Sequence, residues 1–549
     1  MANVIAPIPP AGHHPATHPG RGAGAAVRRL VVFVLLFVLV CLAATGVAGI
    51  ITRIVGAGVS LTDDSTSGLA TSLAFTLIAG PLAALLWWFA WRRLDQRPER
   101  DSPLWGLYLA GMSTVALVLA VTAILTTLAS LISGEWNADA VGTGVAWAGV
   151  WAWHAWMSRD RSKAPTRLTG GSRILGYVFG IAVGASAMIA FVTQLVDLAV
   201  EPAVASSAGS VWFIPLLQSA VWVIGGALVW WGHWTLQGAS ALRTGFATVM
   251  LALVTGLGAV GLTLVGVATS MFVALRLVTE DGARDGILDP LGSALGAAAV
   301  GAIIWAYYRA ALRSSTAAAQ LGARLVGAGV ALGAAATGLG IVVNSILAGI
   351  VAPLAESDEK SLLFAGLSAL VVGGVAWWLI WRPLAPISAE SAGETGRRVY
   401  LIAVFGISAL VAIITLIVIG FQIFDFALGG ADDGSLLERV RGALGLFTAT
   451  VFVAGYHFSV WRHDRSLLPP AEAVVQTIAR VTLVSAADGE ATARAIRGAT
   501  GAAVTVWTSA AEGAAASPEE VVAALDGVSA GRVLVIADLD GVRVIPLRD

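Results

Sequence analysis

The chain has 549 residues, of which 57% are hydrophobic and only 12% are charged, and its mean hydropathy is +0.83. A soluble domain carries about 25% charged residues, so this composition excludes an ordinary soluble protein and predicts a membrane protein. Cys41 is the only cysteine, which excludes an intramolecular disulfide, a zinc ribbon, an iron–sulfur cluster and a thiol redox pair.

The N-terminal segment is predicted to be a disordered arm that leads into a membrane helix. Residues 1–27 are rich in Pro, Gly and His and show no hydrophobic period. Arg28 and Arg29 then open an apolar stretch that reaches about Val55. This stretch is longer than the apolar core of a signal peptide, which has about 7–15 residues. We therefore expect it to remain in the protein as the first transmembrane helix.

Twelve apolar runs follow one another up to residue 461. A helix needs about 20 apolar residues to cross the bilayer core, and the fourth run is the shortest of the twelve. The sequence therefore predicts an all-α polytopic membrane protein with about twelve transmembrane helices. The expected spans are residues 29–55, 70–91, 104–132, 141–157, 173–200, 211–234, 245–275, 290–310, 324–352, 361–381, 398–428 and 441–461.

The runs pair into six helical hairpins, because every second run ends on an aromatic residue, two spacers and another aromatic residue. The second aromatic falls at positions 91, 156, 234, 308, 381 and 461. Self-similarity at a nearly fixed period marks an internal repeat. The six hairpin units are predicted over residues 28–97, 98–165, 166–240, 241–318, 319–388 and 389–465.

Charge alternates between the two ends of the hairpins. The N-terminal arm, the loops between units and the segment through Arg465 hold 21 Lys and Arg residues, whereas the loops inside units hold 6. Because Lys- and Arg-rich loops stay in the cytoplasm, all six hairpins should share one orientation with both termini cytoplasmic. The acidic segments at residues 61–64 and 356–359 should face outward. Arg outnumbers Lys by 31 to 2, a bias that indicates a GC-rich bacterial genome and thus the bacterial cytoplasmic membrane.

The repeated motif places aromatic and basic side chains where the helices leave the membrane. Amphipathic rings favour the headgroup level, and neighbouring arginines can reach lipid phosphates. We favour this anchoring role over a π-lined site for a cationic ligand. The predicted interfacial anchors are Trp88, Trp91, Arg92, Trp153, Trp156, Trp231, Trp234, Trp305, Tyr308, Arg309, Trp378, Trp381, Arg382, Trp461 and Arg462.

Glycines spaced by four residues predict close contacts between helices. Small residues let helix backbones approach each other in lipid. We expect contact faces rather than binding sites at Gly176, Gly180 and Gly184, at Gly292 and Gly296, and at Gly329 and Gly333.

The character of the chain changes after Pro469 and Pro470. Residues 479–485 and 503–508 are rich in strand formers, and residues 490–498 are typical of a helix. Ser517 followed by Pro518 predicts the start of a second helix, and residues 532–537 and 542–546 flank a hairpin turn. Residues 466–549 are therefore predicted to form a linker and a small α/β (βαβαββ) cytoplasmic domain.

Polar residues inside the membrane are the usual pointer to function, and no charged residue lies at the centre of a predicted span. Gln194 and Asp197 in unit three recur as Gln422 and Asp425 in unit six, near outer helix ends. They could line an outer vestibule or bind a cation, although we favour hydrogen bonds between helices. Asn344 is interpreted in the same way, as a helix contact.

Motifs for catalysis are missing from the sequence. It has no GxxxxGK[ST], no HExxH, no GxSxG and no zinc-ligand spacing, which argues against an ATP-driven pump and predicts no catalytic, metal or cofactor site. His154, His233 and His457 lie at different offsets from the aromatic motif, so we do not expect them to share one ligand geometry.

The hairpin unit opens on Arg followed by apolar and aromatic residues, as in Arg398-Val399-Tyr400. It closes on His-, Trp- and Arg-rich ends, as in residues 87–93, 231–234 and 377–382. In these features residues 28–465 resemble a bacterial membrane family catalogued as domain of unknown function 5671. The resemblance implies a multi-pass protein of repeated two-helix units, and it implies no activity, substrate or site.

The sequence thus favours a non-enzymatic membrane scaffold with a cytoplasmic regulatory or partner-binding domain. A transporter or channel for a small solute is the alternative, and a membrane-embedded enzyme is the third hypothesis. The expected partners are the lipid bilayer and a cytoplasmic protein bound through residues 470–549, without nucleic acid and without a cofactor.

Overall fold

The computed structural model describes the chain in twelve stretches, which form two compact units. One unit comprises Met1–Ala385 and Thr395–Phe458, and the other comprises Pro386–Glu394 and Ser459–Asp549. We call them the membrane unit and the C-terminal unit. The described residues are 19–57, 66–200, 212–280, 284–351, 357–384, 394–429, 435–467, 478–485, 489–509, 516–528, 530–538 and 541–547.

The first two predicted hairpins form module 1. Its first helix begins at Pro19, inside the predicted arm, because a proline is favoured in the first turn and the following residues are rich in Ala. Residues 1–18 of that arm lie outside the described residues. The elements are α1 (Pro19–Gly56), α2 (Thr66–Ala74), the π-helical turn η1 (Phe75–Ala79), α3 (Gly80–Arg93), α4 (Arg97–Arg100), α5 (Pro103–Ile132) and α6 (Ala138–Met157).

The third and fourth hairpins form module 2. Two π-helical segments lie in its helices, one at the end of α9 and one between α10 and α11. Hydropathy alone does not predict these segments. The elements are α7 (Gly171–Val200), α9 (Phe213–Trp231), the π-helical η2 (Gly232–Leu236), the 3₁₀ turn η3 (Ala239–Ala241), α10 (Gly245–Ala252), the π-helical η4 (Leu253–Ala259), α11 (Val260–Thr279), α12 (Arg284–Leu288) and α13 (Leu291–Arg313).

The last two hairpins form module 3. The predicted outer acidic residues 61–64 and 356 lie outside the described residues, as do residues 470–477 of the predicted partner-binding segment. The elements are α14 (Ala317–Val351), α15 (Ser357–Trp381), the 3₁₀ turn η5 (Arg382–Leu384), α17 (Thr395–Ala427) and α18 (Leu436–Leu467).

Eleven helices of the described chain are long and apolar enough to cross a membrane, one fewer than the twelve expected. The twelfth helix, α6, exists but falls short because its Gly, Thr and His residues lower its hydropathy. It nevertheless runs from the end of α1 to the start of α5. Just before α6, Trp136 Nε1 donates to the Val55 carbonyl at 3.0 Å, and near the end of α6, His154 Nε2 lies 3.2 Å from the Tyr108 hydroxyl. Burial against α1 and α5 explains why α6 can be less apolar than its neighbours.

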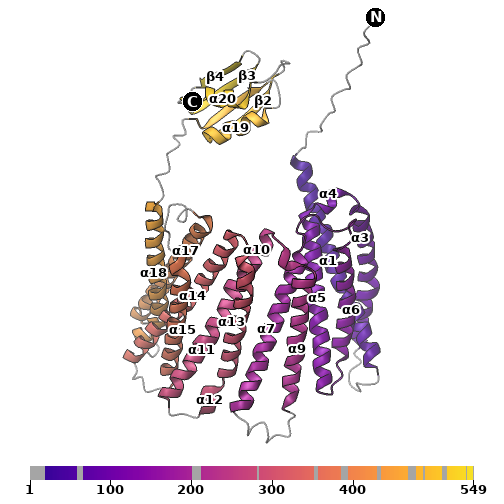
Figure 1. The fold of residues 1–549 in the computed structure, drawn as a ribbon, viewed down its shortest axis with the longest axis vertical. Helices are drawn as coiled ribbons and strands as arrows, with labels where there is room; N and C mark the ends of the chain where they lie inside the picture. Colours follow the sequence, from indigo (N-terminus) through magenta and orange to yellow (C-terminus); the bar gives the residue numbers. More distant parts are fainter. Residues whose placement is uncertain are drawn as a thin grey trace. The chain divides into compact units, whose positions relative to one another are not determined.

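Within the membrane unit the modules stand side by side in chain order (Figure 1). Module 1 meets module 2 where α5 packs against α7 and α9, and module 2 meets module 3 where α11 packs against α15. None of the extensive helix contacts among the described residues joins module 1 to module 3. Each module therefore packs on its neighbours in sequence.

Glycines bring helix backbones into direct contact, as the GxxxG spacing predicts. A Cβ on Gly180 would lie 2.4 Å from the Trp230 nitrogen, and one on Gly226 would lie 2.4 Å from the Gly184 nitrogen. Gly292 and Gly296 likewise meet the backbone of α7, so the first two predicted faces are confirmed. A Cβ on Gly333 would meet nothing within 4 Å, so the prediction for that glycine is wrong.

The C-terminal unit contains a four-stranded sheet with strand order β2-β1-β3-β4. β1 pairs in parallel with β2 and β3, and β3 pairs antiparallel with β4. A capping box between Ser517 and Glu520 starts the second helix at the position that the sequence predicts. The elements are β1 (Arg480–Ser485), α19 (Glu490–Thr500), β2 (Ala503–Thr508), α20 (Pro518–Ala524), β3 (Arg532–Asp538) and β4 (Gly541–Leu547).

Candidate functional site

A cluster of aromatic side chains, most of them buried or half-buried, lies in each of the three modules. Each cluster contains the first and last tryptophans of a Trp-Trp-x-x-Trp sequence, a tyrosine from the start of another helix, and an aromatic residue followed by His or Tyr. Cluster 1 is Trp87, Trp91, Tyr108, Trp153 and His154; cluster 2 is Tyr177, Trp230, Trp234, Tyr307 and Tyr308; cluster 3 is Trp377, Trp381, Tyr400, Tyr456 and His457.

Cluster 1 satisfies the polar atoms of its histidine. His154 Nδ1 donates to the Val150 carbonyl one helical turn earlier, at 2.7 Å. Its Nε2 therefore accepts a hydrogen bond from the Tyr108 hydroxyl at 3.2 Å. Trp87 stacks on the imidazole at a centroid distance of 5.8 Å. The ring is thereby fixed between α3, α5 and α6.

Cluster 2 uses indole-to-phenol hydrogen bonds in place of the histidine. Trp230 Nε1 donates to the Tyr308 hydroxyl at 2.7 Å, and Trp234 Nε1 donates to the Tyr307 hydroxyl at 2.9 Å. Both bonds join α9 and η2 to α13. A cavity of about 510 Å³ borders this cluster, and its wall carries Arg243 and several Ser and Thr hydroxyls.

Cluster 3 leaves polar atoms unpaired. Trp381 Nε1 donates to the Tyr456 hydroxyl at 2.8 Å, and His457 Nδ1 donates to the Val453 carbonyl at 2.8 Å. Three other buried atoms, Trp377 Nε1, the Tyr400 hydroxyl and His457 Nε2, have no hydrogen-bond partner among the described residues. This cluster could therefore bind water or another small polar molecule, which cluster 1 could not do without breaking the Tyr108–His154 bond.

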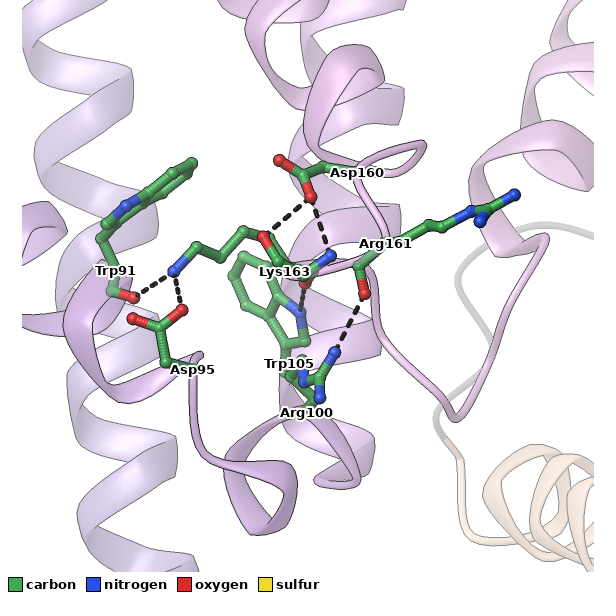
Figure 2. A network of polar contacts seen from close by, with 8 residues as sticks. Trp91, Asp95, Arg100, Trp105, Asp160, Arg161 and Lys163 are labelled. Atoms are coloured by element: carbon green, nitrogen blue, oxygen red, sulfur yellow. Dashed lines mark hydrogen bonds and ion pairs between the residues drawn. The ribbon is translucent and has the colours of Figure 1, made fainter.

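A polar network closes the end of module 1 beside cluster 1 (Figure 2). Lys163 is only 4% exposed, and its Nζ donates to the Trp91 carbonyl at 3.0 Å and to Asp95 Oδ1 at 2.5 Å. The same ammonium lies 4.5 Å from the centroid of the Trp91 ring. In return, Trp105 Nε1 donates to the Lys163 carbonyl at 3.0 Å. The loop at residues 158–170 is thus fastened to both α3 and α5.

Asp160 shapes the turn that presents Lys163. The Ser162 amide and hydroxyl donate to Asp160 Oδ1 at 2.7 and 2.8 Å (Figure 2). These two donors hold the pKa of the Asp160 carboxyl below its ordinary value. The carboxylate therefore stays ionised and keeps the turn closed at neutral pH.

The four polar residues that could line an outer vestibule divide between modules 2 and 3, and one of them forms a hydrogen bond between helices, as the sequence favours. Gln194 lies on α7 and accepts a hydrogen bond from Ser219 of α9 at 3.2 Å, whereas Asp197 on the same helix is exposed. Gln422 and Asp425 lie on α17 in module 3, where Asp425 pairs with Arg439 of α18 at 3.3 Å. The Gln422 amide oxygen is buried without a partner among the described residues.

Asn344 lies where α14 touches α18. A Cβ on Gly445 of α18 would lie 3.3 Å from the Asn344 nitrogen. This position agrees with a contact between helices.

The predicted interfacial anchors divide into two groups. Trp378 is 52% exposed and Arg382 lies over its ring at 5.2 Å, as expected of an anchor, whereas Trp381 is 7% exposed and packs inside cluster 3. The reason is that the first and fifth positions of the sequence Trp377-Trp378-x-x-Trp381 lie about one turn apart on the face toward the neighbouring helix. Trp88, Arg92, Trp153, Trp156, Trp231, Trp305, Arg309 and Arg462 are exposed, Trp91 and Trp461 are half-buried, and Trp234 and Tyr308 are buried.

The clusters were missed because the motif was aligned on the wrong aromatic residues. Trp-Trp-x-x-Trp occurs at residues 87–91, 230–234 and 377–381, at intervals of 143 and 147 residues. This spacing corresponds to two hairpins rather than one. With that repeat as the frame, His154, Tyr308 and His457 take equivalent places, whereas His233 lies inside the Trp-Trp-x-x-Trp sequence itself. The three histidines therefore do not share one place in the repeat.

Comparison with known proteins gives one family. The family model described as Domain of unknown function (DUF5671) matches the chain twice, at residues 29–150 and 318–454. The two matches cover most of modules 1 and 3, and residues 151–317 lie outside both. No curated protein and no solved structure matches the chain.

Proposed function

We propose that this chain, which the DUF5671 model matches twice, is a non-enzymatic scaffold of the bacterial cytoplasmic membrane whose C-terminal domain binds a protein partner. In this proposal module 2 is a third, diverged copy, because it holds a cluster of the same design at the corresponding place in the repeat.

The proposal includes twelve crossings with both termini in the cytoplasm. The excess of Lys and Arg in the loops between hairpins supports this orientation. α6 is counted as a crossing because it has 20 residues, which corresponds to about 30 Å of helix. Its contacts at Val55 and Tyr108 also lie at opposite ends of module 1.

The observation that supports partner binding most strongly is an uncovered face of the C-terminal sheet. Both helices pack on one face, where Ile496 and Val521 join Leu483 and Val535 in the core. The other face carries cross-strand rows of apolar and basic side chains. The rows run Trp507–Val484–Ile536–Arg543 and Thr505–Thr482–Leu534–Ile545.

Trp507 is 62% exposed at the edge of these rows, and Ile545 is also exposed. Contiguous apolar surface of this kind marks interaction sites in soluble domains, and tryptophan with arginine is typical of the residues that dominate binding energy. The surface formed by Trp507, Val484, Ile536, Arg543 and Ile545 is therefore the proposed partner-binding face.

The chemistry of the clusters supports a non-enzymatic function. The Nδ1 atoms of His154, His233 and His457 all donate to helix carbonyls, and none of the hydrogen bonds within the described residues pairs these rings with a carboxylate. A transporter is the second candidate, favoured by the cavity of about 510 Å³ beside cluster 2. The direct backbone contact of α7 with α9 at Gly180 and Gly226 leaves no space for a path between these two helices, which favours the scaffold.

A photo-crosslinking amino acid in the full-length protein tests the proposal in living cells. We expect an adduct when the probe replaces Trp507 or Ile545, and none when it replaces Arg494, an exposed residue of α19 on the other side of the domain. The double substitution Trp507→Glu and Ile545→Glu should also abolish co-purification of the crosslinked partner. Equal adducts at all three positions would contradict the proposed face. Solute flux in liposomes that Asp197→Asn and Asp425→Asn together abolish would favour the transporter.

A further inference from the structure

A pocket of about 460 Å³ opens at the junction of modules 2 and 3. Its walls come from η4, the end of α13, the start of α14 and the end of α15. These helix ends are the ones that carry the aromatic motif and the basic loops, so the proposed topology places the pocket at the inner leaflet.

Three arginines line this pocket without a counter-ion. Arg309, Arg313 and Arg324 are exposed, and no carboxylate is among the lining residues. None of the three forms an ion pair with a described residue. The Arg309 guanidinium lies 4.9 Å from the centroid of Trp305. Among the described residues the pocket is therefore a concentration of positive charge with no carboxylate in its wall.

Most of the rest of the wall is apolar. Leu379 is 58% exposed, and together with Ile380 it extends the pocket along α15 away from the arginines. On the opposite wall η4 contributes Gly256, and a Cβ there would lie 2.7 Å from the Ala323 carbonyl. A π-helical segment is typical of functional sites. Here it lines the base of the pocket.

The corresponding junction between modules 1 and 2 has no comparable space. There the loop at residues 158–170 folds back onto α5, and the cavity beside it measures about 100 Å³. Between modules 2 and 3 the linker is only residues 314–316. Gln320 holds this short linker by donating to the Ser315 carbonyl at 3.2 Å. None of the described residues therefore fills the second junction as the Lys163 loop fills the first.

We propose that this pocket binds an anionic phospholipid. The guanidinium groups of Arg309, Arg313 and Arg324 bind the phosphate, because guanidinium groups match phosphate oxygens in both charge and geometry. An acyl chain lies along Leu379 and Ile380. The lipid thereby occupies the junction between modules 2 and 3 that the protein leaves open.

The test uses the delipidated full-length protein, titrated with phosphatidylglycerol and observed by native mass spectrometry. The variant Arg309→Gln/Arg313→Gln/Arg324→Gln should raise the Kd by at least about tenfold, since each arginine near an anionic surface contributes on the order of fivefold. The control Arg159→Gln/Arg161→Gln/Arg167→Gln removes three exposed arginines of the 158–170 loop, outside the pocket, and should change the Kd by less than about twofold.

A second variant keeps all three arginines. Pro383→Glu places a carboxylate at an exposed position of the pocket wall, so it should weaken phosphatidylglycerol binding, and thermal unfolding checks that the variant folds. An equal loss in the control arginine variant, or equal binding of phosphatidylcholine, would overturn the proposal. Displacement of the lipid by millimolar inorganic phosphate would also overturn it, because the ligand would then be a soluble anion.

Discussion

The buried Lys163 makes a sharp test of how module 1 is held together. Lys163→Met keeps a long apolar stem and removes the ammonium. The substitution deletes a charged hydrogen bond to the Trp91 carbonyl, a cation–π contact, and an ion pair with Asp95. Because the Asp95 side chain is 64% exposed, solvent screens that ion pair and its contribution is below about 1 kcal/mol.

The hydrogen bond and the cation–π contact contribute more. A hydrogen bond from a charged donor is worth about 1.5–3 kcal/mol and a cation–π contact about 0.5–1 kcal/mol. Relief of the desolvation of a buried charge offsets part of this loss. We expect a net destabilisation of about 1–3 kcal/mol, which lowers Tm by several degrees at roughly 2–4 °C per kcal/mol.

Thermal unfolding of the purified protein in detergent, followed by tryptophan fluorescence, measures this effect. The control is Lys360→Met, which removes the only other lysine, an exposed residue near the start of α15. Its effect should stay within about 0.5 kcal/mol. Asp95→Asn should cost less than Lys163→Met. If both lysine variants unfold at the same temperature, the network in Figure 2 does not stabilise module 1.

Three further predictions concern packing, hydrogen bonding and topology. Gly226→Ala should destabilise the protein by about 1–3 kcal/mol or more, because its Cβ would lie 2.4 Å from the Gly184 nitrogen. The control Gly149→Ala has open space around it and should be neutral or stabilise the protein by up to about 1 kcal/mol. Thermal unfolding compares the two variants, and equal destabilisation would contradict the contact at Gly226. Tyr108→Phe should lower the free energy of unfolding by about 1–3 kcal/mol because it leaves His154 Nε2 unpaired. Tyr400→Phe removes a hydroxyl that has no partner among the described residues and should change the free energy of unfolding very little. The reverse order in the same assay would refute this account. In a Cys41→Ser background, cysteine at Glu135 should react with an impermeant maleimide in intact cells, and cysteine at Arg161 should react only after lysis. Labelling of both from one side would mean that α6 does not cross.

The sequence predicts where the helices of this protein lie along the chain better than it predicts which helices pack against one another. Hydropathy locates α1 or α17 because a membrane helix must be apolar along most of its length. It underrates α6, whose Gly142 and Gly144 face other helices rather than lipid. It also cannot separate Trp378 from Trp381, since both have the same composition signal and only the neighbouring helix decides which ring is buried.

The C-terminal strands were predictable for a different reason. The elements around them end or begin at capping residues, such as Gly501 between α19 and β2 and Ser517 before α20, which act within a few positions of the chain. The pairing of Lys163 with Asp95, and of Tyr108 with His154, joins residues 68 and 46 positions apart. Contacts at such separations depend on how modules fold, so no local pattern reveals them.

The two-hairpin repeat has a consequence for how such a chain can change in length. With α6 counted as a crossing, each module passes through the bilayer an even number of times and returns to the side from which it entered. A copy can then be gained or lost without inverting whatever follows it. The C-terminal domain would stay on the same side of the membrane whether one, three or five modules preceded it, so duplication can lengthen the membrane portion without moving that domain across the membrane.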